Sequence, residues 1–109
     1  MIDINTFILI MFVHWVADFI MQTRWMATNK STSNLALGTH IIVYMIPMSM
    51  FGVYFAIING ILHFTVDYFT SRGTSYLWKK QETHMFFILI GLDQFLHMVC
   101  LLYTYKLLN

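Results

Sequence analysis

Apolar residues form three long runs along this chain, separated by short polar segments. The first run covers residues 4–21 and would be about 27 Å long as a helix, enough to cross a thin bilayer. The second covers residues 35–69, and a straight helix of roughly 52 Å would exceed a hydrocarbon core of about 30 Å. Pro47 and Gly52 lie near its centre and predict that it folds back there. The third run covers residues 85–105.

These runs predict an all-α fold, a polytopic membrane bundle of four helices that forms a single transmembrane domain over residues 1–109. The helices are expected at residues 4–22, 34–49, 52–70 and 84–106. Ser33 or Asn34 is the expected N-cap of the second helix, and Thr83 that of the fourth. An acid near the N-terminus and the lack of a small-residue cleavage site favour a retained first helix over a signal peptide.

Composition supports a membrane protein and excludes several other classes. Hydrophobic residues make up 59% of the chain and charged residues 10%, whereas soluble domains carry roughly 25% charged residues. The net charge is +1 and the six basic residues form no stripe, so nucleic acid is not an expected partner. The single cysteine, Cys100, rules out an intramolecular disulfide.

The basic residues also predict an orientation. With an even number of spans, every lysine and arginine except Lys106 falls on one face of the membrane. The positive-inside rule makes that face cytoplasmic and places both termini on the opposite side. The expected location is a bacterial inner membrane or a virus-associated membrane.

A short repeat links two of the predicted helices. His14 and Asp18 are separated by three residues, and so are His63 and Asp67, at an offset of 49 residues. Each pair is followed by a basic segment and a returning helix, so the bundle is interpreted as two related helical hairpins.

Ionisable residues within the apolar runs are the candidate site. Residues four apart share a helix face, so each His-x3-Asp pair points in one direction, as do Asp93 and His97. All four helices carry such groups at similar depth. The predicted metal ligands are His14, Asp18, His63, Asp67, Asp93 and His97, with Asp18 and Asp67 as ligands or general base. His40, Gln22 and Gln94 are expected to lie next to these ligands and to support them without binding the metal.

Imidazole and carboxylate ligands suit a divalent metal, with zinc favoured and manganese or iron as alternatives. The number of ligands leaves room for a second ion. The competing interpretation is that these residues only hold helices together. Interhelical hydrogen bonds in membranes average about 0.6 kcal/mol, whereas an Asp near a helix centre costs about 2.5–3.5 kcal/mol, so the metal interpretation is preferred.

Several of these motifs together resemble a known family. They are His14-x3-Asp18-Phe19-x2-Gln22, Asn29-Lys30 before a helix with His40, His63-x3-Asp67, and Asp93-Gln94-x2-His97. The family comprises small four-span membrane proteins of bacteria and phages, known only as a domain of unknown function. The resemblance implies the fold and singles out these residues, but it implies no reaction.

A looser similarity exists to the membrane hydrolases that include alkaline ceramidases and adiponectin receptors, whose His-x3-Asp and His-x3-His helices bind zinc. This chain has fewer spans and Asp93-x3-His97 in place of two histidines.

Three functions therefore remain. The first is a metal-dependent hydrolase that acts on a lipid or other amphiphile in the cytoplasmic leaflet. The second is a non-enzymatic phage or bacterial membrane component that acts in assembly, lysis control or exclusion, as a homo-oligomer or within a larger assembly. The third is a proton or cation pathway, ranked last because mainly apolar residues follow His97.

Overall fold

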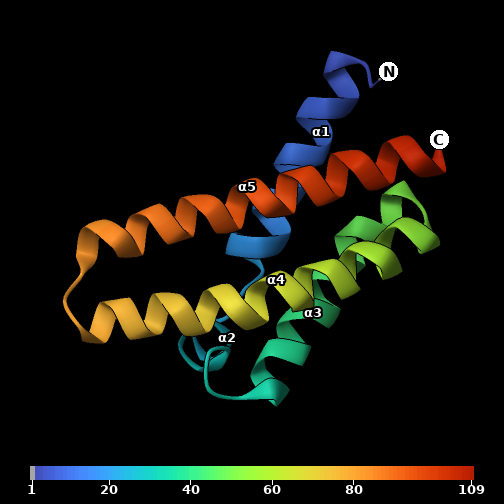
Figure 1. Cartoon of the computed structure of the whole chain (residues 1–109). Helices are drawn as coiled ribbons and strands as arrows, with labels where there is room; N and C mark the ends of the chain where they lie inside the picture. The colour runs from blue at the N-terminus through green and yellow to red at the C-terminus, as the bar shows by residue number, and fades with distance from the viewer. Residues whose placement is uncertain (1) are drawn as a thin grey trace.

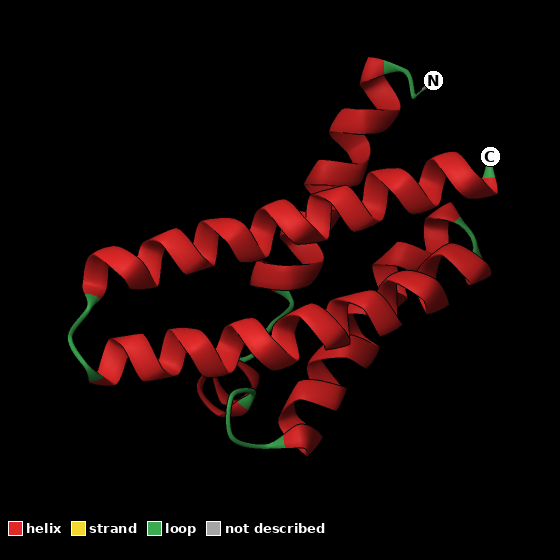
Figure 2. Cartoon of the chain, viewed as in Figure 1, coloured by secondary structure: helices red, strands yellow, loops and turns green. Residues whose placement is uncertain are grey.

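The structure is a computed structural model that describes residues 2–109, and it contains no strand within that range. The helices are α1 (Ile4–Trp15), α2 (Arg24–Asn29), α3 (Asn34–Met48), α4 (Val53–Lys79) and α5 (Thr83–Leu108). A π-helical turn, η1 (Val16–Ile20), continues α1, and a 3-10 turn, η2 (Ser49–Phe51), follows α3. The predicted all-α class is confirmed, and Figure 2 shows that only short loops join the helices.

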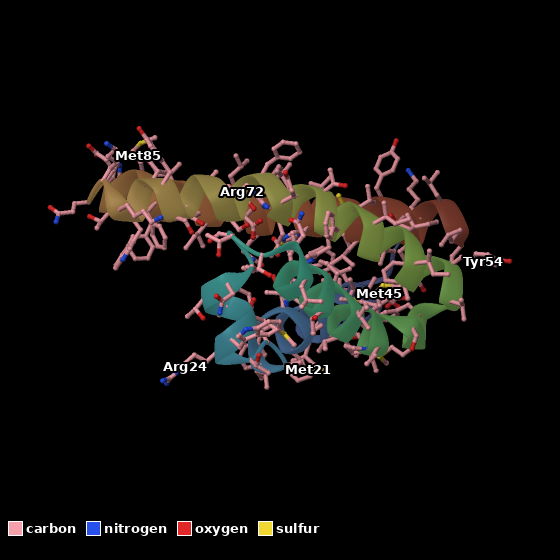
Figure 3. The ribbon with its side chains drawn as sticks, turned by 90° about the horizontal axis from the view of Figure 1, so that it is seen from below. Met21, Arg24, Met45, Tyr54, Arg72 and Met85 are labelled. Carbon is pink, nitrogen blue, oxygen red and sulfur yellow. The ribbon has the colours of Figure 1, made fainter. Side chains whose placement is uncertain are left out.

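The helices are arranged in two layers. Figure 1 shows α4 and α5 side by side as a long antiparallel pair, with α1 crossing α5 and α3 packed against α4. The view in Figure 3 places α4 and α5 in one layer and the segment from α1 to α3 in the other, with Tyr54 and Met85 at opposite ends of the α4–α5 layer. Both termini lie at the end of the molecule that carries the turn between η2 and α4 (Figure 1).

Polar side chains define several helix starts. Asp3 accepts hydrogen bonds from the Thr6 amide at 3.0 Å and from the Thr6 hydroxyl at 2.8 Å, and these bonds lower the pKa of Asp3. Ser33 is the N-cap of α3 and accepts the amide of Ala36 at 3.2 Å. The predicted cap at Thr83 is wrong, because α5 begins at Thr83 itself and has no side-chain cap.

The structure also corrects the end of one predicted helix and adds a short helix. Helix α4 continues to Lys79, so Arg72, which was expected in a loop, lies within the helix. The segment after residue 70 is polar but contains no proline and only one glycine, so nothing in it breaks a helix. The short helix α2 was not predicted. The turn after α3 lies at Gly52, where φ is 123°, a conformation that glycine adopts without strain.

Apolar residues cover the outside of this molecule. Leu35, Phe69 and Leu107 are 74%, 69% and 74% exposed, and many other large apolar side chains are exposed as well. Within residues 2–109, two helical segments are long and apolar enough to cross a membrane, Asn34–Phe51 and α5, while Ile4–Ile20 is apolar but shorter. The interior combines an apolar core, which includes Ile10 and Tyr44, with a group of buried polar residues.

Candidate metal centre

The buried polar residues come from four parts of the chain. Asp18 lies in η1, His40 in α3, His63 and Asp67 in α4, and Asp93 and His97 in α5. All except Asp93 are at most 4% exposed. Asp18 sits in a π-helical turn, a local distortion of the helix that is frequent at functional sites.

Two imidazoles and two carboxylates form what we call the four-ligand group: Asp18, His40, His63 and Asp67. His40 Nε2 lies 3.0 Å from Asp18 Oδ1 and 3.4 Å from Asp67 Oδ2. His63 Nε2 lies 3.3 Å from Asp18 Oδ1 and 3.2 Å from Asp67 Oδ2, and the two Nε2 atoms are 3.3 Å apart. Ligands placed tetrahedrally at about 2.0–2.1 Å from Zn²⁺ are about 3.3–3.4 Å from one another. Five of the six distances among these atoms lie at 3.0–3.4 Å and therefore match a tetrahedral ion.

Hydrogen bonding alone does not account for this arrangement. Asp18 Oδ1 is buried and accepts no hydrogen bond of acceptable geometry among residues 2–109, although two imidazole nitrogens lie close to it. At most one proton can lie along the 3.3 Å contact between His40 Nε2 and His63 Nε2, so one of these nitrogens donates and the other accepts. A cation between the four atoms would satisfy all of them at once.

The two imidazoles are oriented by packing. His40 Nδ1 and His63 Nδ1 have no hydrogen-bond partner in the described part of the chain, unlike most metal-ligating histidines. The His63 ring instead lies between Tyr44, at a centroid distance of 4.1 Å, and His97, at 3.8 Å.

A second set, the three-ligand group, adjoins the first and consists of Asp18, Asp93 and His97. His97 Nε2 lies 3.2 Å from Asp93 Oδ1 and 3.0 Å from Asp67 Oδ1. The Thr70 hydroxyl donates a hydrogen bond to Asp93 Oδ1. Asp18 thus belongs to both groups, and Asp67 contacts residues of both.

His14 and Gln94 support the acids. The two nitrogens of His14 lie 2.8 Å from Tyr44 Oη and 2.8 Å from Gln94 Oε1. Gln94 Nε2 donates to Asp18 Oδ2 at 3.2 Å and to Asp93 Oδ2 at 3.1 Å. His14 was predicted as a ligand, but both of its nitrogens bind protein groups, and its Nε2 lies 3.8 Å from Asp18 Oδ2.

The structure places most of the other predicted residues in or beside the two groups. Asp18, His63, Asp67, Asp93 and His97 are brought together, as the sequence predicted. His40 was expected to support the ligands without binding the metal, but it is one of the four residues that could hold a metal ion. Gln22 lines the adjacent cavity, and its Oε1 has no hydrogen-bond partner among residues 2–109.

Lys30 was not predicted as a site residue. Its Nζ lies 3.5 Å from Asp67 Oδ2, and the side chain is 22% exposed. No spacing rule placed it there, and its only signal was the Asn29-Lys30 motif of the resemblance. Tyr44 and Thr70 were also missed, although Thr70 stands three residues after Asp67 and so shares its side of α4.

A partly open cavity of about 210 Å³ adjoins the acids. Its lining includes Asp18, Asp67 and Asp93 from the two groups, together with Lys30 and Thr70. The cavity therefore brings carboxylates, a cation and a hydroxyl to one space that a small polar group can enter.

The fold and the site define an all-α protein with apolar helices and a buried His/Asp cluster that could hold a metal ion. The chain belongs to the family DUF3307, described as a protein of unknown function, whose model matches residues 6–109. No curated protein and no solved structure matches the chain.

Proposed function

We propose that this chain is a four-span integral membrane protein that binds a divalent metal ion through the four-ligand group and hydrolyses an ester or phosphoester bond of an amphiphilic substrate. The observation that carries the proposal is the near-tetrahedral spacing of Asp18 Oδ1, His40 Nε2, His63 Nε2 and Asp67 Oδ2. Zinc is the favoured ion because two imidazoles and two carboxylates at these distances match its preference, and manganese or iron could bind the same atoms.

The apolar exterior supports membrane insertion. Helix α5 is long and apolar, and only 11% of the residues in its most apolar 18-residue stretch are buried inside the chain. In water, that much exposed apolar surface would favour aggregation. Helix α4 is the least apolar of the long helices, because it carries Asn59, His63 and Asp67, yet these side chains are buried. In our proposal the basic segments face the cytoplasm of a bacterial or virus-associated membrane.

A bound divalent ion would supply an activated water and would polarise the carbonyl or phosphoryl oxygen of the substrate. Asp18 and Asp67 would hold the ion, and the carboxylate of Asp93 at the cavity would accept a proton from the attacking water. The water oxygen would bond to the acyl carbon or phosphorus as the bond to the alcohol oxygen breaks, and the proton on Asp93 would pass to the leaving alcohol. Lys30 would hold an anionic headgroup beside the cluster, since its ammonium lines the same cavity.

The test is metal content after purification in detergent, with hydrolysis of fluorogenic ester and phosphoester micelles as the second measurement. We expect at least one divalent ion per chain, and we expect chelation to abolish hydrolysis and zinc to restore it. His63→Ala and His40→Ala should lose the ion, whereas His84→Ala, at an exposed histidine, should keep it. No bound metal in folded wild-type protein after zinc addition would overturn the proposal.

A second candidate is a non-enzymatic membrane component in which the cluster only joins helices. The observation that favours it is that His14 is satisfied by Tyr44 and Gln94 without any ion. Under this alternative, Asp18→Asn and Asp67→Asn should keep full function in the host and should not change metal content. A cation pathway is not proposed, because an apolar core that includes Ile10 and Leu101 fills the bundle.

A further inference from the structure

We propose that the cluster holds two metal ions that share the carboxylates of Asp18 and Asp67. This inference rests on the proposed function and adds a second position, formed by the three-ligand group together with Asp67. The first ion would lie in the four-ligand group, and the second between Asp93 and His97 on the α5 side. Asp93 would then act as a metal ligand, in place of the proton acceptor that it is in the single-ion arrangement.

Each of the two shared carboxylates divides its oxygens between the two positions. Asp67 Oδ2 faces His40 and His63, at 3.4 Å and 3.2 Å, whereas Asp67 Oδ1 faces His97 at 3.0 Å. Asp18 Oδ1 faces the same two imidazoles, whereas its Oδ2 points to the α5 side and accepts a hydrogen bond from Gln94. Carboxylates that bridge two metals use one oxygen for each ion, which is the arrangement seen here.

The stacked imidazoles give an independent measure of the spacing between the two positions. The rings of His63 and His97 are nearly parallel, at an interplanar angle of 5°, and their centroids are 3.8 Å apart. Their Nε2 atoms contact the two different oxygens of Asp67. Ions bound to these two nitrogens would be separated by about the stacking distance, and two-metal enzymes hold their ions about 3.5–4 Å apart.

The charge of the cluster calls for at least one ion and admits a second. Asp18, Asp67 and Asp93 carry three negative charges when ionised, and Lys30 is the one lysine or arginine paired with them in the described residues. Two imidazole nitrogens lie 3.0 Å and 3.3 Å from Asp18 Oδ1, but neither makes a hydrogen bond of acceptable geometry within the described residues. One divalent ion would neutralise the set. A second would leave a positive centre that attracts hydroxide and an anionic substrate group into the cavity.

The experiment measures ions per chain and the distance between them. Purified protein is stripped with a chelator, reloaded with Mn²⁺ and examined by elemental analysis and electron paramagnetic resonance. We expect two ions per chain and an exchange-coupled spectrum. Asp93→Asn, which preserves side-chain shape, and His97→Ala should each reduce the content to one ion and remove the coupling, while His84→Ala keeps both.

The outcomes separate this inference from the proposed function. One ion per wild-type chain, unchanged in Asp93→Asn, overturns the second position and leaves the single-ion proposal intact. Two ions without coupling overturn the shared carboxylates. The absence of any bound ion overturns both proposals. A folded circular dichroism spectrum is required of each variant, and Asp93→Asn decides the result if His97→Ala does not fold.

Discussion

Gly60 sets how closely α3 and α4 approach, and replacing it with alanine tests whether that approach shapes the site. A Cβ atom at Gly60 would lie 2.5 Å from Met45 Sδ and 2.8 Å from Met45 Cγ. Small residues at such crossings let membrane helices pack closely. The same two helices carry His40 and His63, whose Nε2 atoms are 3.3 Å apart.

Two opposing contributions set how Gly60→Ala changes the free energy of unfolding. Overpacking at a close contact costs about 1–3 kcal/mol, and Met45 Cγ, close to the backbone, moves less easily than the end of the side chain. Replacing glycine by alanine within a helix contributes about 0.5–1 kcal/mol in the other direction. Gly38 is the matched control because a Cβ there meets nothing within 4 Å. We expect Gly38→Ala to be stabilising and Gly60→Ala to be about 1–3 kcal/mol less stable than Gly38→Ala.

Equilibrium unfolding in mixed detergent and SDS micelles, followed by circular dichroism, measures this difference, and zinc titration measures the site. Gly60→Ala should bind zinc more weakly than Gly38→Ala because the two histidines are pushed apart. Adding Met45→Ala should restore much of the loss if the clash is its cause. Equal stabilisation by the two alanines, with equal zinc affinity, would refute the reasoning.

Tyr44→Phe should cost about 0.6–1.7 kcal/mol in the same unfolding assay, because it removes the interhelical hydrogen bond to His14; no loss would contradict it. Lys30→Met should weaken the binding of inorganic phosphate to the metal-loaded protein by about tenfold or more, because a hydrogen bond to a charged group is lost. Its metal content should not change, and calorimetric titrations with phosphate and with zinc check the two expectations. The stability that the Asp3 cap contributes should be complete above the unfolded pKa of about 3.9 and should be lost as pH falls through the lowered folded pKa. The Thr6 amide should therefore lose protection against hydrogen exchange in acid, relative to its intrinsic rate at the same pH, and Asp3→Asn should remove this pH dependence.

The sequence predicted the helices well where apolar runs are long. The turn at Gly52 and the start of α3 at Ser33 follow from local rules on glycine and capping, and both are found. The extension of α4 past residue 70 was missed because the polar residues after this position were taken to indicate a loop. The end of a helix that leaves the apolar region is polar as well, so polarity alone does not distinguish the two. The number of membrane spans stays a prediction.

The gathering of the acids was predictable from residues four apart, but the role of each histidine was not. His40 has no acid on its own helix, and only the rotation of α3 against α4 brings its Nε2 to Asp18. His14 was predicted as a ligand on α-helical geometry, whereas Asp18 lies in the wider π-helical turn η1, which changes the angle between the two residues. Gln94 was expected to support the ligands, and its side chain donates hydrogen bonds to Asp18 Oδ2 and Asp93 Oδ2.

Energetics favour an ion over a purely structural cluster. Three aspartates within membrane helices would cost roughly 7–10 kcal/mol. Their hydrogen-bond partners on other segments are Gln94 for Asp18, Lys30 and His97 for Asp67, and Thr70 for Asp93. At about 0.6 kcal/mol each, these four bonds supply roughly 2 kcal/mol. The shortfall is concentrated at the buried Asp18 Oδ1, which accepts no hydrogen bond among residues 2–109. A divalent ion at this oxygen would supply the missing partner.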